Sequence, residues 1–127
     1  MQNLDNKSRN QPKYSLFKNT SYALSGLRMV FRDESSFKLE FFIIAPFIII
    51  SLFLDVSLSE HLLLAGSMVI ILIVECINSA IERCIDIVTN EYHILAKQAK
   101  DAGSGAVFLS ISMAMITWIS ILWNLVF

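Results

Sequence analysis

The stretch from Ala102 to Phe127 contains 26 residues and no charged side chain. About 20 consecutive apolar residues are enough for a helix to cross the hydrocarbon core of a bilayer. Two further apolar stretches precede it, at 41–54 and 62–81, and hydrophobic residues make up 55% of the 127-residue chain. A soluble domain of this size leaves about a third of the surface of its unfolded chain in contact with water. Because so much apolar surface would stay wet, the sequence predicts an all-α membrane protein.

We predict three spans, at about 37–56, 62–88 and 102–125. The first includes Glu40 and Asp55 near its ends, because its uncharged core is only 14 residues long. Residues 12–33 mix apolar and basic side chains, a pattern typical of an amphipathic helix on a membrane surface. Residues 1–11 are polar without an apolar period, so we expect them to be disordered. Residues 12–127 then form one membrane-embedded domain.

The basic residues are unevenly distributed around these spans. Seven lie in residues 1–38, up to the start of the first span, none lie from there to the end of the apolar stretch 62–81, three lie in residues 83–101, and none lie after them. The positive-inside rule therefore places the N-terminus and segment 83–101 in the cytoplasm. The start of the chain lacks the order of basic, apolar and small residues of a leader, so we expect no cleavable signal peptide. Cys76 and Cys84 are too few for a disulfide framework.

Four polar side chains lie on the second predicted span and its cytoplasmic extension. At about 100° per residue, Glu75, Glu82 and Asp86 fall within roughly 40° of one another, and Asn78 lies about 60° to one side. A carboxylate at membrane depth costs several kcal/mol by most scales, so it indicates function. The alternative is a structural carboxylate bonded to another helix.

Spacing alone leaves three chemistries open for these acids: binding a divalent cation, accepting a proton from a hydroxyl, or relaying protons across the membrane. Other charged residues are expected at the same cytoplasmic depth, namely Glu34, Glu40, Glu91, His93, Lys97, Lys100 and Asp101. A metal site beside cations favours a phosphate-bearing substrate.

The second predicted span carries the run Glu75-Cys-Ile-Asn-Ser-Ala-Ile-Glu82 with Asp86, and the segments Glu-Tyr-His at 91–93 and Ala-Lys-Asp-Ala-Gly-Ser at 99–104 follow it. Together these residues resemble the prokaryotic diacylglycerol kinase family. The resemblance extends from about Tyr14 to Asn124. It implies an ATP-dependent kinase of the bacterial inner membrane, with several spans, an N-terminal surface helix and three identical subunits that share their active sites. The expected product is phosphatidate.

The resemblance also implies roles for individual residues. Glu75 matches the catalytic base and Asn78 supports it, while Glu34 and Glu82 match the ligands of Mg²⁺. Contacts to ATP and its metal are implied for Tyr22, Glu34, Glu82, Glu91, Tyr92, His93, Lys100 and Asp101. Contacts to the lipid substrate are implied for Arg28, Phe37, Glu75, Ser104 and Trp118.

Two positions depart from the family pattern, because Ser15 and Ser25 stand where the family often has Arg and Lys. These departures leave one nucleotide contact and one head-group contact unassigned. No GxxxxGK[ST] run is present, so a P-loop is excluded. Two alternatives remain: an undecaprenol kinase of the same family, and a small membrane protein that carries protons or ions along the Glu75 face without chemistry.

Overall fold

The computed structural model describes residues 13–127, and these residues form helices without any strand. The helices are α1 (Leu16–Asp33), α2 (Ser35–Ser51), α3 (Leu58–Val88) and α4 (Ile94–Val126). The all-helical fold predicted from the sequence is therefore confirmed for the described residues. The prediction of disorder for residues 1–11 lies outside them.

The ends of the helices follow from local capping. α1 begins at Leu16, four residues later than expected, after Ser15, whose side chain caps the backbone N–H of Lys18. α3 begins at Leu58, four residues earlier than the predicted span. There the Ser57 side chain accepts a hydrogen bond from the Glu60 backbone, and the Glu60 carboxylate accepts one from the Ser57 backbone.

Two other boundaries differ more from the predicted spans. α2 starts at Ser35 and ends at Ser51, five residues before the predicted end, and the chain then turns through residues 52–57. α4 begins at Ile94, eight residues earlier than expected, because the Nδ1 atom of His93 accepts a hydrogen bond from the backbone N–H of Leu95 at 3.2 Å. Lys100 and Asp101 therefore lie on α4 itself.

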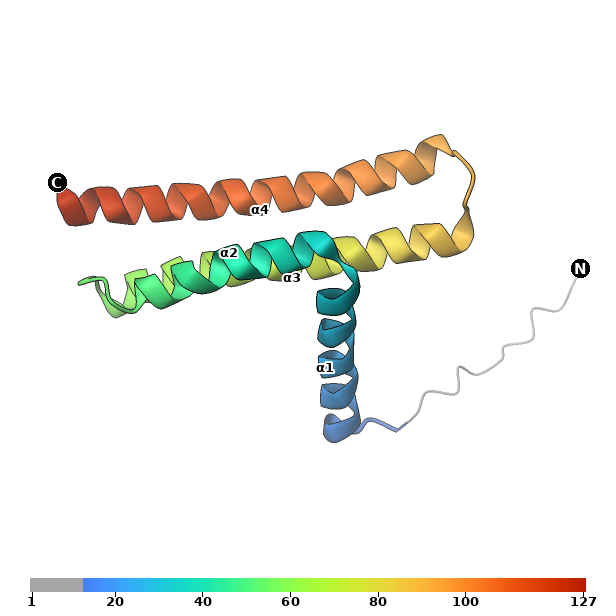
Figure 1. Ribbon diagram of the computed structural model, residues 1–127, viewed down its shortest axis with the longest axis horizontal. Helices are drawn as coiled ribbons and strands as arrows, with labels where there is room; N and C mark the ends of the chain where they lie inside the picture. The colour runs from blue at the N-terminus through green and yellow to red at the C-terminus, as the bar shows by residue number, and fades with distance from the viewer. Residues whose placement is uncertain (1–12) are drawn as a thin grey trace, which may run out of the picture.

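α3 is the central helix of the fold, with α2 and α4 packed along it and α1 leaving the bundle crosswise (Figure 1). One apolar core joins α2, α3 and α4, formed by Ile44, Leu64, Met68, Ile71, Ala114, Trp118 and Ile121. The indole N–H of Trp118 donates a hydrogen bond to the backbone oxygen of Leu64 at 3.2 Å, which satisfies its polar group within this core.

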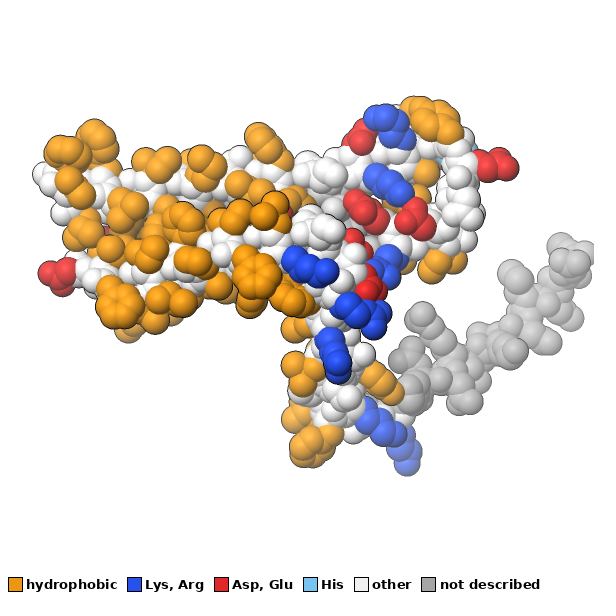
Figure 2. All heavy atoms as spheres, in the orientation of Figure 1, with side chains coloured by type: hydrophobic (Ala, Val, Ile, Leu, Met, Phe, Trp, Pro, Cys, Tyr) orange, Lys and Arg blue, Asp and Glu red, His pale blue; other side chains and the backbone are white. Residues whose placement is uncertain are grey.

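Two helices are long and apolar enough to cross a membrane. α3 and α4 contain 31 and 33 residues, and only 39% and 22% of their most apolar 18-residue windows are buried within the chain. A core helix of a soluble protein would be mostly buried, so these faces are suited to lipid or to other membrane helices. Figure 2 shows apolar side chains along most of the bundle and charged side chains gathered near α1 and the α3–α4 turn.

The role of α2 as a third span remains a prediction. Its 17 residues extend about 26 Å at 1.5 Å per residue, slightly less than the hydrocarbon core of roughly 30 Å. The helix continues through Pro46, which lacks the N–H of an ordinary helical residue.

Candidate functional site

A cleft of about 300 Å³ opens among α2, α3 and α4 at the charged end of the bundle, and we call it the acidic cleft. It brings together residues from distant parts of the sequence, including six of those singled out above. Its lining consists of Glu34, Ser36, Glu40, Glu75, Asn78, Ser79, Glu82, Ser104 and Val107. Four carboxylates therefore face one small space.

Glu75 is the most deeply placed acid of this cleft, with 5% of its surface exposed. The hydroxyl group of Ser36, on the first turn of α2, donates a hydrogen bond to its Oε1 atom. Ser36 could not be identified from the sequence, because it is 39 residues away from Glu75 and belongs to no motif. The contact shows that this carboxylate can accept a hydrogen bond from an alcohol.

Asn78 lies one turn along α3 and is also buried. Its Nδ2 atom donates to Oε1 of Glu82 at 3.3 Å, while its Oδ1 atom has no hydrogen-bond partner among the described residues. Gly103 of α4 packs directly against this amide, and a Cβ atom built there would overlap Oδ1 and lie 3.3 Å from Cγ. The close approach of α4 therefore fixes the position of the amide beside Glu82.

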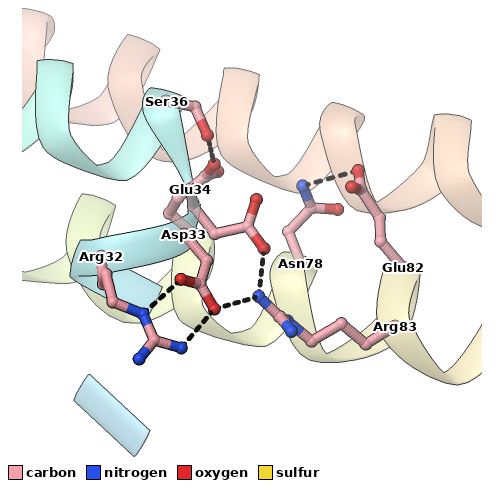
Figure 3. A network of polar contacts seen from close by, with 8 residues as sticks. Arg32, Asp33, Glu34, Ser36, Asn78, Glu82 and Arg83 are labelled. Atoms are coloured by element: carbon pink, nitrogen blue, oxygen red, sulfur yellow. Dashed lines mark hydrogen bonds and ion pairs between the residues drawn. The ribbon is translucent and has the colours of Figure 1, made fainter. Parts of the chain in front are cut away.

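Glu34 is the single residue between α1 and α2, and its backbone is extended. The side chain of Glu34 accepts a hydrogen bond from the guanidinium of Arg83 at 2.9 Å (Figure 3). The neighbouring Asp33 carboxylate is held by Arg32, whose Nε donates to it at 2.6 Å. This hydrogen bond lowers the pKa of Asp33. Both acids at the helix junction are thus paired with arginines.

The donor set of the acidic cleft suits a hard divalent cation. Mg²⁺ is commonly held by one or two carboxylates together with substrate phosphates and water. Glu34 and Glu82 both line the cleft, and the unpartnered Oδ1 of Asn78 lies beside Glu82. Within residues 13–127, no group of three or more His, Cys, Asp or Glu side chains is arranged to hold a metal. Two carboxylates of the cleft could therefore hold such a cation only if water or phosphate oxygens supplied its remaining ligands.

A second cavity, of about 400 Å³, lies where α3 and α4 join, and we call it the turn cavity. Its lining includes Asp86 and all five residues predicted near that turn to contact nucleotide: Glu91, Tyr92, His93, Lys100 and Asp101. The Nζ atom of Lys100 lies 2.7 Å from Oδ1 of Asp86. The other predicted nucleotide contact, Tyr22, is 69% exposed on α1 and lines neither cavity.

The predicted lipid contacts fall into three different places. Ser104 lines the acidic cleft. Arg28 and Phe37 line an apolar groove of about 670 Å³ formed by α1, α2 and α3. Trp118 lines another apolar groove, of about 420 Å³, between α2 and α4, where Glu40 is the one acidic side chain. One chain alone does not gather these residues around one substrate.

Comparison with known proteins places the sequence among the diacylglycerol kinases of bacteria. The sequence model described as prokaryotic diacylglycerol kinase matches residues 21–122. The diacylglycerol kinase of Escherichia coli K12 is 38% identical over 109 residues, which cover 86% of this chain and 89% of that protein. The diacylglycerol kinase of Pseudomonas aeruginosa PAO1 is 40% identical over 103 residues, covering 81% and 84%. That of Haemophilus influenzae Rd is 35% identical over 107 residues, covering 84% and 91%.

Proposed function

The chain belongs to the prokaryotic diacylglycerol kinase family of lipid kinases, and on this premise we propose that it transfers the γ-phosphoryl group of ATP to the hydroxyl of diacylglycerol. The reaction takes place at the cytoplasmic face of the bacterial inner membrane and yields phosphatidate and ADP. The observation that supports this proposal most directly is the acidic cleft, where a buried carboxylate on an apolar helix already accepts a hydrogen bond from an alcohol.

Glu75 acts as the general base in this proposal. The hydroxyl of diacylglycerol takes the place of the Ser36 hydroxyl and gives its proton to the Glu75 carboxylate. Its oxygen forms a bond to the γ-phosphorus as the bond from that phosphorus to the β–γ bridging oxygen breaks. ADP leaves with that oxygen. Asn78 keeps the Glu82 carboxylate in place through its 3.3 Å hydrogen bond.

The residues that would hold Mg²⁺ are Glu34 and Glu82. When bound, the metal offsets the negative charge that develops on the transferring phosphoryl group. The turn cavity receives the nucleotide, with Lys100 supplying a cation, and Glu91, Tyr92, His93 and Asp101 forming its walls. Glu82 lines the acidic cleft and Asp86 lines the turn cavity. The two residues are one helical turn apart on α3, so a triphosphate can extend from the turn cavity to the acidic cleft.

The lipid reaches Glu75 sideways from the inner leaflet. We propose that Arg28, Phe37, Ser104 and Trp118 contact it, together with residues of neighbouring subunits. The dispersed positions of these residues and of Tyr22 within one chain, and the exposed apolar surface of α4, favour a homotrimer with shared sites. The chain then crosses the membrane three times with its N-terminus in the cytoplasm, in accordance with its basic residues.

A phosphorylation assay tests the base assignment. Purified protein in mixed micelles is incubated with radiolabelled ATP and either diacylglycerol or undecaprenol. We expect labelling of diacylglycerol, and a reduction of at least about 100-fold in Glu75→Gln, because general base catalysis typically contributes this much. Glu60→Gln is the matched control, since glutamine also serves at this capping position.

Three outcomes would contradict parts of the proposal. Near-normal turnover in Glu75→Gln would exclude Glu75 as the base. Preferential labelling of undecaprenol would identify undecaprenol as the substrate in place of diacylglycerol, with the mechanism unchanged. We also expect Glu82→Ala to raise the Mg²⁺ concentration needed for half-maximal activity, and an unchanged requirement would exclude Glu82 as a ligand.

A further inference from the structure

Arg83 follows the proposed metal ligand Glu82 directly in sequence and points to the other proposed ligand, Glu34. Its Nη2 atom lies 2.9 Å from Oε1 of Glu34 and 3.7 Å from Oδ2 of Asp33. Its Nε atom is buried and has no hydrogen-bond partner among the described residues. Figure 3 shows the guanidinium between the helix junction and α3. The contact therefore joins segments 49 residues apart in the sequence.

The charges of the acidic cleft explain why a cation is needed at this place. Glu34, Glu40, Glu75 and Glu82 all line a space of about 300 Å³. In the part of the chain that the structure describes, Arg83 is the only basic side chain that forms an ion pair with any of them. Like charges in a confined space raise one another's energy, so a counter-ion stabilises the folded cleft.

We propose that Arg83 is the resident counter-ion of Glu34 in the metal-free protein, and that a divalent cation takes over this carboxylate when it binds. This inference rests on the proposed function, because it takes Glu34 as a metal ligand. A guanidinium at 2.9 Å uses a lone pair of Oε1 and repels an incoming dication. Arg83 thereby weakens metal binding and sets the metal concentration at which the kinase becomes active.

A purely structural role for Arg83 gives a different expectation. In that case the ion pair would only brace the α1–α2 junction against α3, and its loss would reduce stability without strengthening metal binding. The two roles are separated by a direct binding measurement that does not depend on turnover.

The measurement is a titration of the full-length protein in detergent micelles with Mn²⁺, followed by the paramagnetic resonance signal of the free ion. Arg83→Gln and Arg83→Met both remove the charge, the first keeping hydrogen-bond donors and the second keeping the apolar stem. We expect either variant to bind Mn²⁺ about two- to fivefold more tightly than the wild type, where fivefold corresponds to the upper end of the range for loss of one partly exposed ion pair. Arg83→Lys keeps the charge and should remain close to the wild type.

Arg32→Gln is the matched control. It removes the same charge from the same helix junction, but Arg32 pairs with Asp33 and not with Glu34. Its Mn²⁺ affinity should stay at the wild-type value. Weaker or unchanged binding in both Arg83→Gln and Arg83→Met would overturn the proposal, as would equal tightening in Arg32→Gln.

Glu34→Gln distinguishes failure of this inference from failure of the proposed metal site. If Glu34→Gln lowers Mn²⁺ affinity while the neutral Arg83 variants bind like the wild type, the metal site stands and the counter-ion role is excluded. If Glu34→Gln leaves Mn²⁺ binding unchanged, Glu34 is not a ligand, and both the metal assignment and the role of Arg83 are refuted.

Discussion

Replacement of Gly103 by alanine should displace the Asn78 amide and thereby disturb Glu82. The added Cβ would overlap Oδ1 of Asn78, which is buried, so the amide must rotate or α4 must move away. Overpacking of this kind costs about 1–3 kcal/mol, whereas alanine is favoured over glycine inside a helix by up to about 1 kcal/mol. We therefore expect Gly103→Ala to lower the free energy of unfolding by about 1 kcal/mol.

Gly105 lies on the same helix and provides the matched control, because a Cβ atom built there would have no neighbour within 4 Å. Gly105→Ala should raise the free energy of unfolding by up to about 1 kcal/mol, because alanine has a higher helix propensity than glycine and no contact opposes it. Unfolding in mixed micelles with an increasing mole fraction of sodium dodecyl sulfate measures both variants. Equal stability of the two would show that the approach of α4 to Asn78 places no constraint on residue 103.

The same substitution should affect activity more than stability. Rotation of the amide breaks its hydrogen bond to the Glu82 carboxylate, and a misplacement of about 1 Å at a reacting centre can lower a rate by about 100-fold. Turnover in Gly103→Ala should therefore fall by about tenfold or more, at roughly 1.4 kcal/mol per tenfold. In an Asn78→Ala background the further loss caused by Gly103→Ala should disappear, because the two sites are coupled. Independent effects would refute the reasoning.

Two further substitutions test the core and the turn cavity. Trp118→Phe removes the indole N–H, while the oxygen of Leu64 still accepts a hydrogen bond from the Ser67 hydroxyl at 2.9 Å. The free energy of unfolding should therefore fall by about 0.5–1.5 kcal/mol, the net contribution of one hydrogen bond, and an unchanged unfolding transition would show that the bond contributes nothing. Lys100→Met removes the cation that is paired with Asp86 in the turn cavity. The KM for MgATP should rise several-fold, with little change in the KM for lipid. An increase in the lipid KM alone would place Lys100 outside the nucleotide site.

Helical periodicity explains how much of the site the sequence predicts. The positions of Glu75, Asn78 and Glu82 on α3 follow from a local rule, because side chains three, four and seven residues apart lie on neighbouring parts of one helix face. The structure places all three in the lining of one cleft. Their distances from groups on other helices do not follow from that rule.

Ser36, Arg83 and Gly103 are the residues of this site that sequence reasoning missed. Ser36 approaches α3 from α2 and belongs to no motif. Gly103 belongs to the Ala-Lys-Asp-Ala-Gly-Ser run at 99–104, but nothing in that run predicts its contact with Asn78. Arg83 follows Glu82, but the helical period turns it about 100° away from the acidic face. It reaches Glu34 only because the chain changes direction at that residue between α1 and α2.

The ends of the helices also depend partly on the apolar pattern of the sequence and partly on individual hydrogen bonds. Apolar runs indicate where lipid can surround a helix, but hydrogen bonds of Ser57 and His93 decide where α3 and α4 begin. Lys100 and Asp101, which precede the predicted third span, therefore lie on α4.

By itself the sequence determined that the chain is helical, that parts of it are long and apolar enough to enter a membrane, and that one helix carries a row of acids. These properties depend on each residue and its near neighbours along the chain. Only the tertiary structure decided which helices bring an alcohol, a guanidinium and a glycine to those acids. Such contacts depend on the direction in which each helix leaves the turn before it, and a turn of a few residues sets that direction for the whole helix.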